Sequence, residues 1–255
     1  AATPGARPLG GGTDLLPNLR DGLGEPTALV DLAGVAGLSA ITVTRERTTI
    51  GSGVTLRRIA SDDALRETLP VLAEAAATIA GPGHRTVATL GGNLCLDTRC
   101  VFYNQSEWWR RANDFCLKHG GDVCHVAPQG EHCHAAFSGD LAPALLVLGT
   151  EVEIAGPCGV RSIPLQELYA EDGARHLTLL PGEIVAAIHI PVQPARARSG
   201  YRKARVRGAI DFPLAGVAAR IEVVDGRLRG LSVALTGTNS RPFLLEGAAA
   251  LVAEL

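Results

Sequence analysis

Apolar residues recur along the first part of the chain with spacings that predict an alternation of short strands and helices. Residues 28–32 form an apolar run typical of a buried strand, and residues 41–43 and 48–50 predict the two arms of a hairpin. Between residues 55 and 80 the apolar positions follow helical spacing, with a break at Pro70. This part of the chain therefore predicts a small α/β lobe.

The pattern resumes after residue 135 and changes near residue 195. It predicts a helix, a strand, a helical piece and a strand, in that order, at residues 140–148, 150–154, 163–169 and 184–191. The next segment, QPARARS at 193–199, has the composition of a linker and predicts a domain boundary near residue 195.

Three antiparallel strands and one helix are predicted beyond that boundary, at residues 201–206, 214–224, 228–235 and 246–255. The Asp225-Gly226 pair between the last two strands predicts a hairpin turn. We therefore expect two domains, 1–195 and 196–255, and we expect the second, a small α+β module, to lack its closing elements.

One segment differs in composition from the rest of the chain. Residues 95–134 hold five of the six cysteines, four of the seven histidines and five of the ten aromatic residues. An ordinary surface loop does not have this composition, so we expect the segment to bind a ligand. Its last four cysteines are separated by steps of 16, 8 and 9 residues: Cys100, Cys116, Cys124 and Cys133.

Such spacing favours a metal centre without fixing its kind. The segment has no Cys-x-x-Cys pair of the sort that zinc knuckles use, whereas an iron-sulfur cluster is larger than one ion and tolerates wider spacing. Two alternatives stay open. One is a zinc site that uses the histidines of the segment, His119, His125, His132 or His134. The other is a set of disulfides, which is weaker because only Cys158 lies outside the segment and no secretory signature is seen.

Composition narrows the functional class. A chain of 255 residues with 46% hydrophobic and 20% charged residues can bury a sizeable core. A net charge of −2 argues against a nucleic-acid surface. No apolar run reaches the roughly 18 to 20 residues that cross a bilayer, and we expect a cytoplasmic protein with no membrane span.

Two glycine turns are candidates for ligand binding. Residues 10–14, Gly-Gly-Gly-Thr-Asp, join a short strand to a helix that Thr13 or Asp14 could cap. Glycines allow a close approach of the backbone, so this turn could cradle a pyrophosphate, although it does not follow the G-x-G-x-x-G pattern and a simple tight turn stays open. The second turn is Gly-Gly-Asn at 91–93. It and a further turn, Ser-Gly-Asp at 138–140, flank the cysteine-rich segment on its two sides. There Asp140 is either a helix cap or a ligand contact.

Five stretches carry a family resemblance: LGGGTDLL, TLGGNL, SGDLAPALLVLGTEVEI, LLPGEIVAAIHIP and YRKARVRGAIDFPLAGVA. Together they resemble the FAD-binding subunit of the xanthine dehydrogenase and carbon monoxide dehydrogenase family of molybdenum hydroxylases, over nearly the whole chain. The cysteine-bearing insertion resembles that of the 4-hydroxybenzoyl-CoA reductase beta subunit, in which four cysteines hold an additional 4Fe-4S cluster. The matching positions are Cys100, Cys116, Cys124 and Cys133, whereas Cys95 and Cys158 match no ligand position.

This resemblance implies an α+β fold, namely a two-lobed FAD-binding fold of the vanillyl-alcohol-oxidase/PCMH-like type followed by a small α+β C-terminal domain. It also implies which residues bind FAD. They are Leu9, Gly10, Gly11, Gly12, Thr13 and Asp14, then Thr89, Gly91, Gly92 and Asn93, and also Asp140, Leu180 and Lys203. Arg202 competes with Lys203 for the place beside the flavin.

The function implied by the resemblance is that of an electron-transfer subunit with FAD and one 4Fe-4S cluster. Partner subunits would carry two 2Fe-2S clusters and the molybdenum cofactor, and the reaction would remove a ring hydroxyl from an aromatic acyl-CoA. Alternatives are another molybdenum hydroxylase with a different substrate, a stand-alone FAD oxidase, and a zinc-stabilised module.

We further expect the cluster to accept single electrons from a low-potential donor, a ferredoxin. In that hypothesis Arg110 and Arg111 dock the acidic donor, with a solvated charged face as the alternative. Trp108 and Trp109 are expected to exclude water from the cluster.

Overall fold

The computed structural model describes residues 3–253 and contains two large sheets. The first sheet has five strands in the order β3-β4-β7-β5-β6, and all neighbouring pairs are antiparallel. Its strands are β3 (Ile41–Val43), β4 (Arg47–Gly51), β5 (Glu151–Gly156), β6 (Gly159–Pro164) and β7 (Ile184–Pro191). Ile50, Val152 and Ile188 are fully buried, because one face of the sheet covers the core.

The second sheet has four antiparallel strands in the order β11-β10-β9-β8. They are β8 (Ala197–Ala204), β9 (Ala215–Val224), β10 (Arg227–Thr236) and β11 (Phe243–Leu244). The predicted hairpin is confirmed: Asp225 and Gly226 both have positive φ, 51° and 74°, as a tight turn of this kind requires. Helix α9 (Ala248–Ala253) packs on β10.

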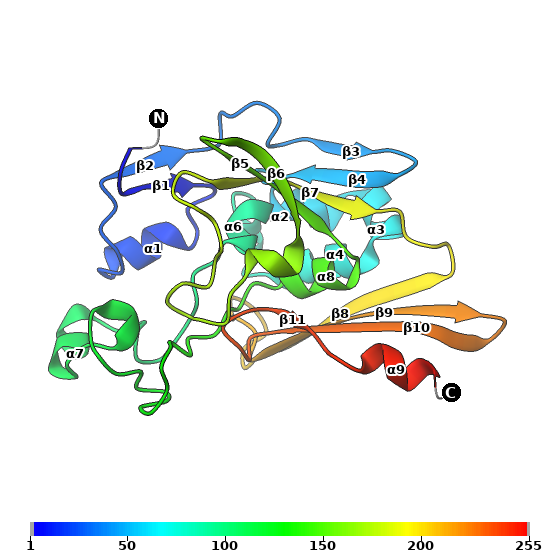
Figure 1. The fold of residues 1–255 in the computed structure, drawn as a ribbon. Coiled ribbons are helices and arrows are strands. Elements are labelled where there is room, and N and C mark those ends of the chain that lie inside the picture. Colours follow the sequence, from blue (N-terminus) through cyan, green and yellow to red (C-terminus); the bar gives the residue numbers. More distant parts are fainter. Residues whose placement is uncertain (1–2, 254–255) are drawn as a thin grey trace.

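Helices fill the space between the two sheets (Figure 1). They are α2 (Leu56–Ser61), α3 (Asp63–Thr68), α4 (Pro70–Thr78), α5 (Pro82–Arg85), α6 (Leu90–Leu94) and α8 (Leu141–Val147). Every residue of α8 is buried, because this helix packs on α4 and α6 and against β9 and β10 of the second sheet. One hydrophobic core therefore runs from the five-stranded sheet through the helices to the four-stranded sheet.

The N-terminal part forms a separate layer. Strand β1 (Ala6–Leu9) pairs in parallel with β2 (Ala28–Asp31), and α1 (Leu15–Arg20) connects them. All four residues of β2 are exposed, so the prediction of a buried strand is wrong. The apolar run predicted burial, but in the described part of the chain β2 pairs only with β1 in a two-stranded sheet.

The cysteine-rich insertion extends away from both sheets, at the lower left of Figure 1. It contains α7 (Glu107–Ala112) and the short 3-10 helix η1 (Leu117–His119). Its two ends are joined by an antiparallel bridge between Arg99 and Ala136. The insertion is therefore anchored at its base.

Other element predictions differ from the structure in detail. The helical stretch 55–80 is three helices, because Asp62 caps a new one with its side chain before Pro70 begins the next. Residues 163–169 end strand β6 and form the 3-10 helix η2 (Leu165–Leu168). Strand β8 already begins at Ala197, within the predicted linker, and the second sheet has β11 as an additional strand. The last two residues of the predicted C-terminal helix lie outside the described residues.

The α+β class is confirmed by this arrangement of mixed sheets and helices. Among residues 3–253, no helix has the length and apolar character needed to cross a membrane.

Candidate functional site

The two glycine segments, residues 9–14 and 89–93, lie against each other. A Cβ on Gly10 would stand 2.8 Å from the hydroxyl oxygen of Thr89, and one on Gly11 would overlap the carbonyl of Val87. Gly12 has a φ of +70°, which favours glycine. The first turn thus needs glycine largely because it packs on the chain, a reason that the sequence interpretation, with its emphasis on ligand approach, had not considered.

The first turn also offers unused donors. The N–H groups of Gly11, Gly12 and Thr13 find no acceptor among the residues that the structure describes. Adjacent free N–H groups in a turn form a concavity that suits an anion, so the turn fits a pyrophosphate. Asp14 stands at the N-cap of α1, but its side chain makes no capping hydrogen bond.

The second segment is a short helix and not an open turn. Thr89 caps α6, with its hydroxyl accepting a hydrogen bond from the N–H of Gly92 at 3.1 Å. Gly91 is packed on Ser52, whereas Gly92 is exposed and a Cβ there would touch only Thr89. Of these two glycines, Gly92 is the one with room beside it for a ligand.

Asn93 links this helix to the third segment. Its side-chain oxygen accepts a hydrogen bond from the N–H of Leu141, the first residue of α8, at 3.0 Å. The structure therefore brings together the two segments that flank the insertion. Asp140 is the residue before α8, and it makes no capping hydrogen bond either.

Asp140 instead belongs to a buried polar triad with two residues of β8. Its carboxylate accepts hydrogen bonds from the Tyr201 hydroxyl at 2.7 Å and from the Lys203 ammonium at 3.0 Å, and the side chains of Asp140 and Lys203 are both 2% exposed. Burial raises the pKa of Asp140, and the Lys203 charge opposes that shift. Burial likewise lowers the pKa of Lys203, and Asp140 opposes it.

Tyr201 was missed by the sequence analysis, although a signal existed. Alternate residues of a strand point to the same face, so Tyr201 and Lys203 had to share one, while Arg202 points to the other. The structure agrees: Arg202 is 86% exposed and pairs with Glu74. Lys203 is the cation that lies beside Asp140.

Leu180 lies apart from this triad. It is 63% exposed, on the loop before β7, where the carboxylate of Glu183 accepts its N–H at 2.8 Å. Arg161 of β6 donates two hydrogen bonds to Glu183, each of 2.8 Å, and lowers the pKa of that carboxyl to about 2. Strand β6 thus holds the loop that carries Leu180, through the contact of Arg161 with Glu183.

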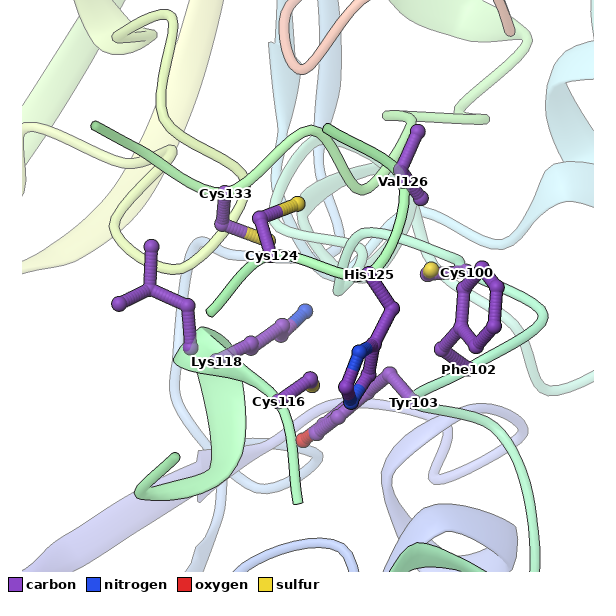
Figure 2. A pocket seen from close by; sticks show the side chains of 10 residues that line it. Cys100, Phe102, Tyr103, Cys116, Lys118, Cys124, His125, Val126 and Cys133 are labelled. Carbon is purple, nitrogen blue, oxygen red and sulfur yellow. The ribbon is translucent and has the colours of Figure 1, made fainter. Parts of the chain in front are cut away.

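Four of the five cysteines of the insertion line one pocket. Cys100, Cys116, Cys124 and Cys133 surround it together with aromatic, apolar and basic side chains (Figure 2). The last three are buried, and Cys100 is partly exposed. Residues separated by up to 33 positions therefore present their thiols to the same space.

The thiols of the pocket are free, and most histidines of the insertion lie outside it. Within residues 3–253, no three side chains of His, Cys, Asp or Glu are gathered closely enough to bind a single metal ion. All six cysteines carry free thiols. Of the histidines, only His125 lines the pocket, and its Nε2 is 2.6 Å from the carbonyl oxygen of Phe115, which occupies that nitrogen.

The other two cysteines lie elsewhere. Cys95 is at the C-cap of α6, packed against the hydrophobic core, and burial raises its pKa to about 12. Cys158 is exposed in the turn between β5 and β6. Neither lines the pocket.

Lys118 is a pocket residue that the sequence analysis did not single out. Its ammonium donates to the Asp97 carboxylate at 2.7 Å and to the Thr98 carbonyl at 3.0 Å. It also lies 4.3 Å from the centre of the Tyr103 ring. A positive charge is therefore fixed at the wall of the pocket, as Figure 2 shows.

The expectation that Arg110 docks a partner is wrong. Arg110 is 1% exposed, and its guanidinium donates to the carbonyls of Asp21 and Gly22, each at 3.2 Å. It ties the insertion to the turn after α1. Arg111 does face solvent and pairs with Glu107, while Trp108, expected to exclude water, is 77% exposed.

Comparison with known proteins identifies the family. Residues 1–193 match the family described as the FAD binding domain in molybdopterin dehydrogenase. The aldehyde oxidoreductase FAD-binding subunit PaoB of Escherichia coli is 35% identical, over 96% of this chain and 78% of that protein. The carbon monoxide dehydrogenase medium chain of Afipia carboxidovorans is 28% identical, over 95% of this chain and 70% of that one.

The fold agrees with that assignment. The structure of reconstituted CO dehydrogenase from Oligotropha carboxidovorans superposes with a TM-score of 0.77 at 26% identity, covering 98% of this chain and 73% of that chain. The chain belongs to the FAD-binding domains of molybdopterin dehydrogenases, and it is an FAD-binding oxidoreductase subunit of the xanthine dehydrogenase and carbon monoxide dehydrogenase family.

Proposed function

We propose that this chain is an electron-transfer subunit that holds both FAD and one 4Fe-4S cluster. The observation that carries the proposal is the pocket that Cys100, Cys116, Cys124 and Cys133 line together. In the part of the chain that the structure describes, no three His, Cys, Asp or Glu side chains are close enough to bind one ion. Four thiolates with such spread suit a cluster better than zinc.

The FAD site is supported by a different set of contacts. The unused N–H groups of residues 11–13 suit the pyrophosphate, and Gly92 leaves room beside them. We assign to FAD the residues of the two glycine segments, residues 9–14 and 89–93, together with Asp140 and Lys203. Leu180 would reach the flavin from its exposed loop before β7.

Each group has one chemical role when bound: FAD exchanges electrons in pairs or singly, and the cluster exchanges them singly. The chain's own residues bind and insulate these groups. Tyr103, Phe102 and Leu117 cover the cysteine pocket against water, and Lys118 places a positive charge beside the four thiolates. Asp140 and Lys203 keep a fixed, buried pair of charges at the proposed flavin site.

Two substrate classes are candidates for the complete enzyme. The resemblance of the insertion to that of 4-hydroxybenzoyl-CoA reductase favours reductive dehydroxylation of an aromatic acyl-CoA. The 35% identity to an aldehyde oxidoreductase subunit favours aldehyde oxidation. In both cases the substrate would bind to a partner subunit that carries the molybdenum cofactor, a second partner would carry two 2Fe-2S clusters, and the complex would be cytoplasmic.

A ferredoxin is a candidate electron partner, but the exposed surface of the insertion does not favour the docking of an acidic one. The exposed charges of the insertion are mainly carboxylates, Glu107, Asp114, Asp122 and Glu131, against Arg111. Such a surface suits the basic part of a partner. Ferredoxin-driven turnover that persists undiminished in a Cys124→Ser complex would show that the cluster is not the entry point for electrons.

The proposal is tested by the cofactor content of the anaerobically purified protein. We expect flavin bands together with broad cluster absorption, and iron at about four atoms per chain above the content of the Cys124→Ser variant. Flavin without that extra iron would leave an ordinary FAD subunit, and zinc in its place would favour the structural module. The substrate classes are separated by assaying the complex with a reduced donor and an aryl-CoA, and with an aromatic aldehyde and an electron acceptor.

A further inference from the structure

Helix α1 is shared by the two proposed cofactor sites. It begins at Leu15, directly after the first glycine turn and the N-cap residue Asp14, and its far end leads into a turn that packs against the insertion. Leu23 of that turn forms a small buried cluster with Tyr103 and Cys116, and Cys100 packs on it. A six-residue helix thus has the proposed pyrophosphate site at one end and two of the proposed cluster ligands at the other.

Arg99 connects the same regions by a second route. Its backbone forms two hydrogen bonds with Ala136, of 2.7 and 2.8 Å, which close the base of the insertion. Its guanidinium pairs with Asp14, donates to the side-chain oxygen of Asn18 at 3.1 Å, and lies 4.5 Å from the centre of the Phe212 ring. Asn18 in turn donates to Asp14 at 3.2 Å. The side chain is therefore fixed from three directions.

Arg99 directly precedes one of the proposed cluster ligands in the chain. The next residue is Cys100, the first of the four pocket cysteines, and the N–H of Cys100 is itself held by the Asn104 side chain at 2.9 Å. Any movement of Asp14 that accommodates a pyrophosphate must move or strain Arg99, and with it the backbone that positions Cys100. The buried Arg110, bound to the carbonyls of Asp21 and Gly22, prevents α1 from separating from the insertion at its other end.

We propose that FAD binding and cluster binding are thermodynamically coupled through α1, and that Arg99 is the positioning residue that couples them. This inference rests on the proposed function. Each cofactor orders elements that the other also needs, so whichever binds second meets a site already ordered. The coupling is reciprocal: the cluster must raise the affinity for FAD by the same factor by which FAD stabilises the cluster.

The experiment measures the dissociation constant of FAD in two forms of the complete complex, under anaerobic conditions. One form has the cluster, and the other carries Cys124→Ser. Cys124 is chosen because it takes no part in the apolar cluster on Leu23, whereas a change at Cys116 would disturb α1 directly. In the otherwise wild-type protein we expect FAD to bind at least about fivefold more tightly when the cluster is present.

The same pair of measurements is repeated with Arg99→Met, Arg99→Lys and Arg111→Met. The ratio of the two dissociation constants is the readout. Loss of a positive charge near the phosphates weakens FAD binding equally in both forms, so it leaves this ratio unchanged. We expect the ratio to fall close to one in Arg99→Met, to recover in part in Arg99→Lys, which keeps a charge for Asp14, and to stay at the wild-type value in Arg111→Met. Arg111 is the matched control because it lies on the insertion but pairs only with Glu107 at the surface.

A ratio of one in the wild-type background would overturn the coupling, even if every Arg99 variant failed to fold. An undiminished ratio in Arg99→Met would overturn the assignment of the coupling to Arg99. Absence of FAD or of the Cys124-dependent iron in the wild-type complex would instead overturn the proposed function, so the two failures are distinguishable.

Discussion

Replacing Lys203 by Met is expected to destabilise the protein strongly at neutral pH. Asp140 and Lys203 are each 2% exposed, so the variant leaves a buried carboxylate with only the Tyr201 hydroxyl as a side-chain partner. Breaking a buried ion pair by removing one partner costs about 3 to 5 kcal/mol. The neighbouring Arg202→Met is the control. Arg202 is 86% exposed, and loss of its pair with Glu74 should cost less than about 1 kcal/mol.

The defect should depend on pH with a defined sign. Burial raises the pKa of Asp140, and loss of the Lys203 charge removes the largest interaction that opposes this shift. An acid whose folded-state pKa lies above the unfolded value binds its proton more tightly when folded, so stability falls as pH rises from the unfolded to the folded pKa. The cost of Lys203→Met should therefore shrink as pH is lowered from 7 towards 5, because protonation removes the unpaired charge.

Denaturant unfolding of both variants at pH 7 and pH 5, followed by circular dichroism, measures these differences. The Asp140→Asn, Lys203→Met double variant should recover part of the loss, because it removes the unpaired charge as well as the cation. A loss below about 1 kcal/mol at pH 7, or a loss that grows on acidification, would refute the reasoning about the pair.

Three further predictions concern the cofactor sites. Gly92→Val should lose FAD and keep its iron, because the added side chain meets only Thr89 of the chain and would extend into the space proposed for FAD. Gly91→Val should instead lower the melting temperature, because its Cβ would lie 2.7 Å from that of Ser52. Equal flavin retention by wild type and Gly92→Val would contradict the first part. Serine in place of any of Cys100, Cys116, Cys124 or Cys133 should remove the iron measured by chemical analysis, while Cys95→Ala and Cys158→Ala keep it; a reversed pattern would make the ligand set wrong. Lys118→Met should lower the reduction potential of the cluster in a redox titration, because a positive charge beside the thiolates favours the reduced state; a potential equal to that of Arg111→Met would leave Lys118 without an electrostatic role.

Much of the fold follows from local pattern. The hairpin of β9 and β10 is visible in Asp225-Gly226, and the sequence pattern predicts the hairpin of β3 and β4 and the strand β7. Strand β6 was not predicted because it is an edge strand, with mostly exposed residues and no alternation of apolar and polar positions. The start of β8 was not predicted for a related reason. β8 is also an edge strand, and edge strands tolerate the arginines that made residues 193–199 resemble a linker.

The candidate site was predicted only in part because its glycines have two roles that sequence alone does not separate. Gly11 and Gly91 are glycines because backbone or side-chain atoms of the chain occupy the place of a Cβ, while Gly92 borders open space. Likewise, Asn93 has a polar side chain because it holds α8, whatever ligand lies nearby. Contacts between segments far apart in sequence decide these roles.

The charges of the insertion show why Arg110 was misjudged and what its burial achieves. Residues 95–134 contain five acidic and four basic residues, so the segment is nearly neutral in sum. In the structure the charges are separated: Arg110 and Lys118 turn inward, while four of the carboxylates face solvent. Thiolates bound to the proposed cluster would repel each other, and the Lys118 ammonium at the wall of the pocket would reduce that repulsion. Arg110 lies too deep to meet a partner protein, and its burial ties the insertion to the turn after α1.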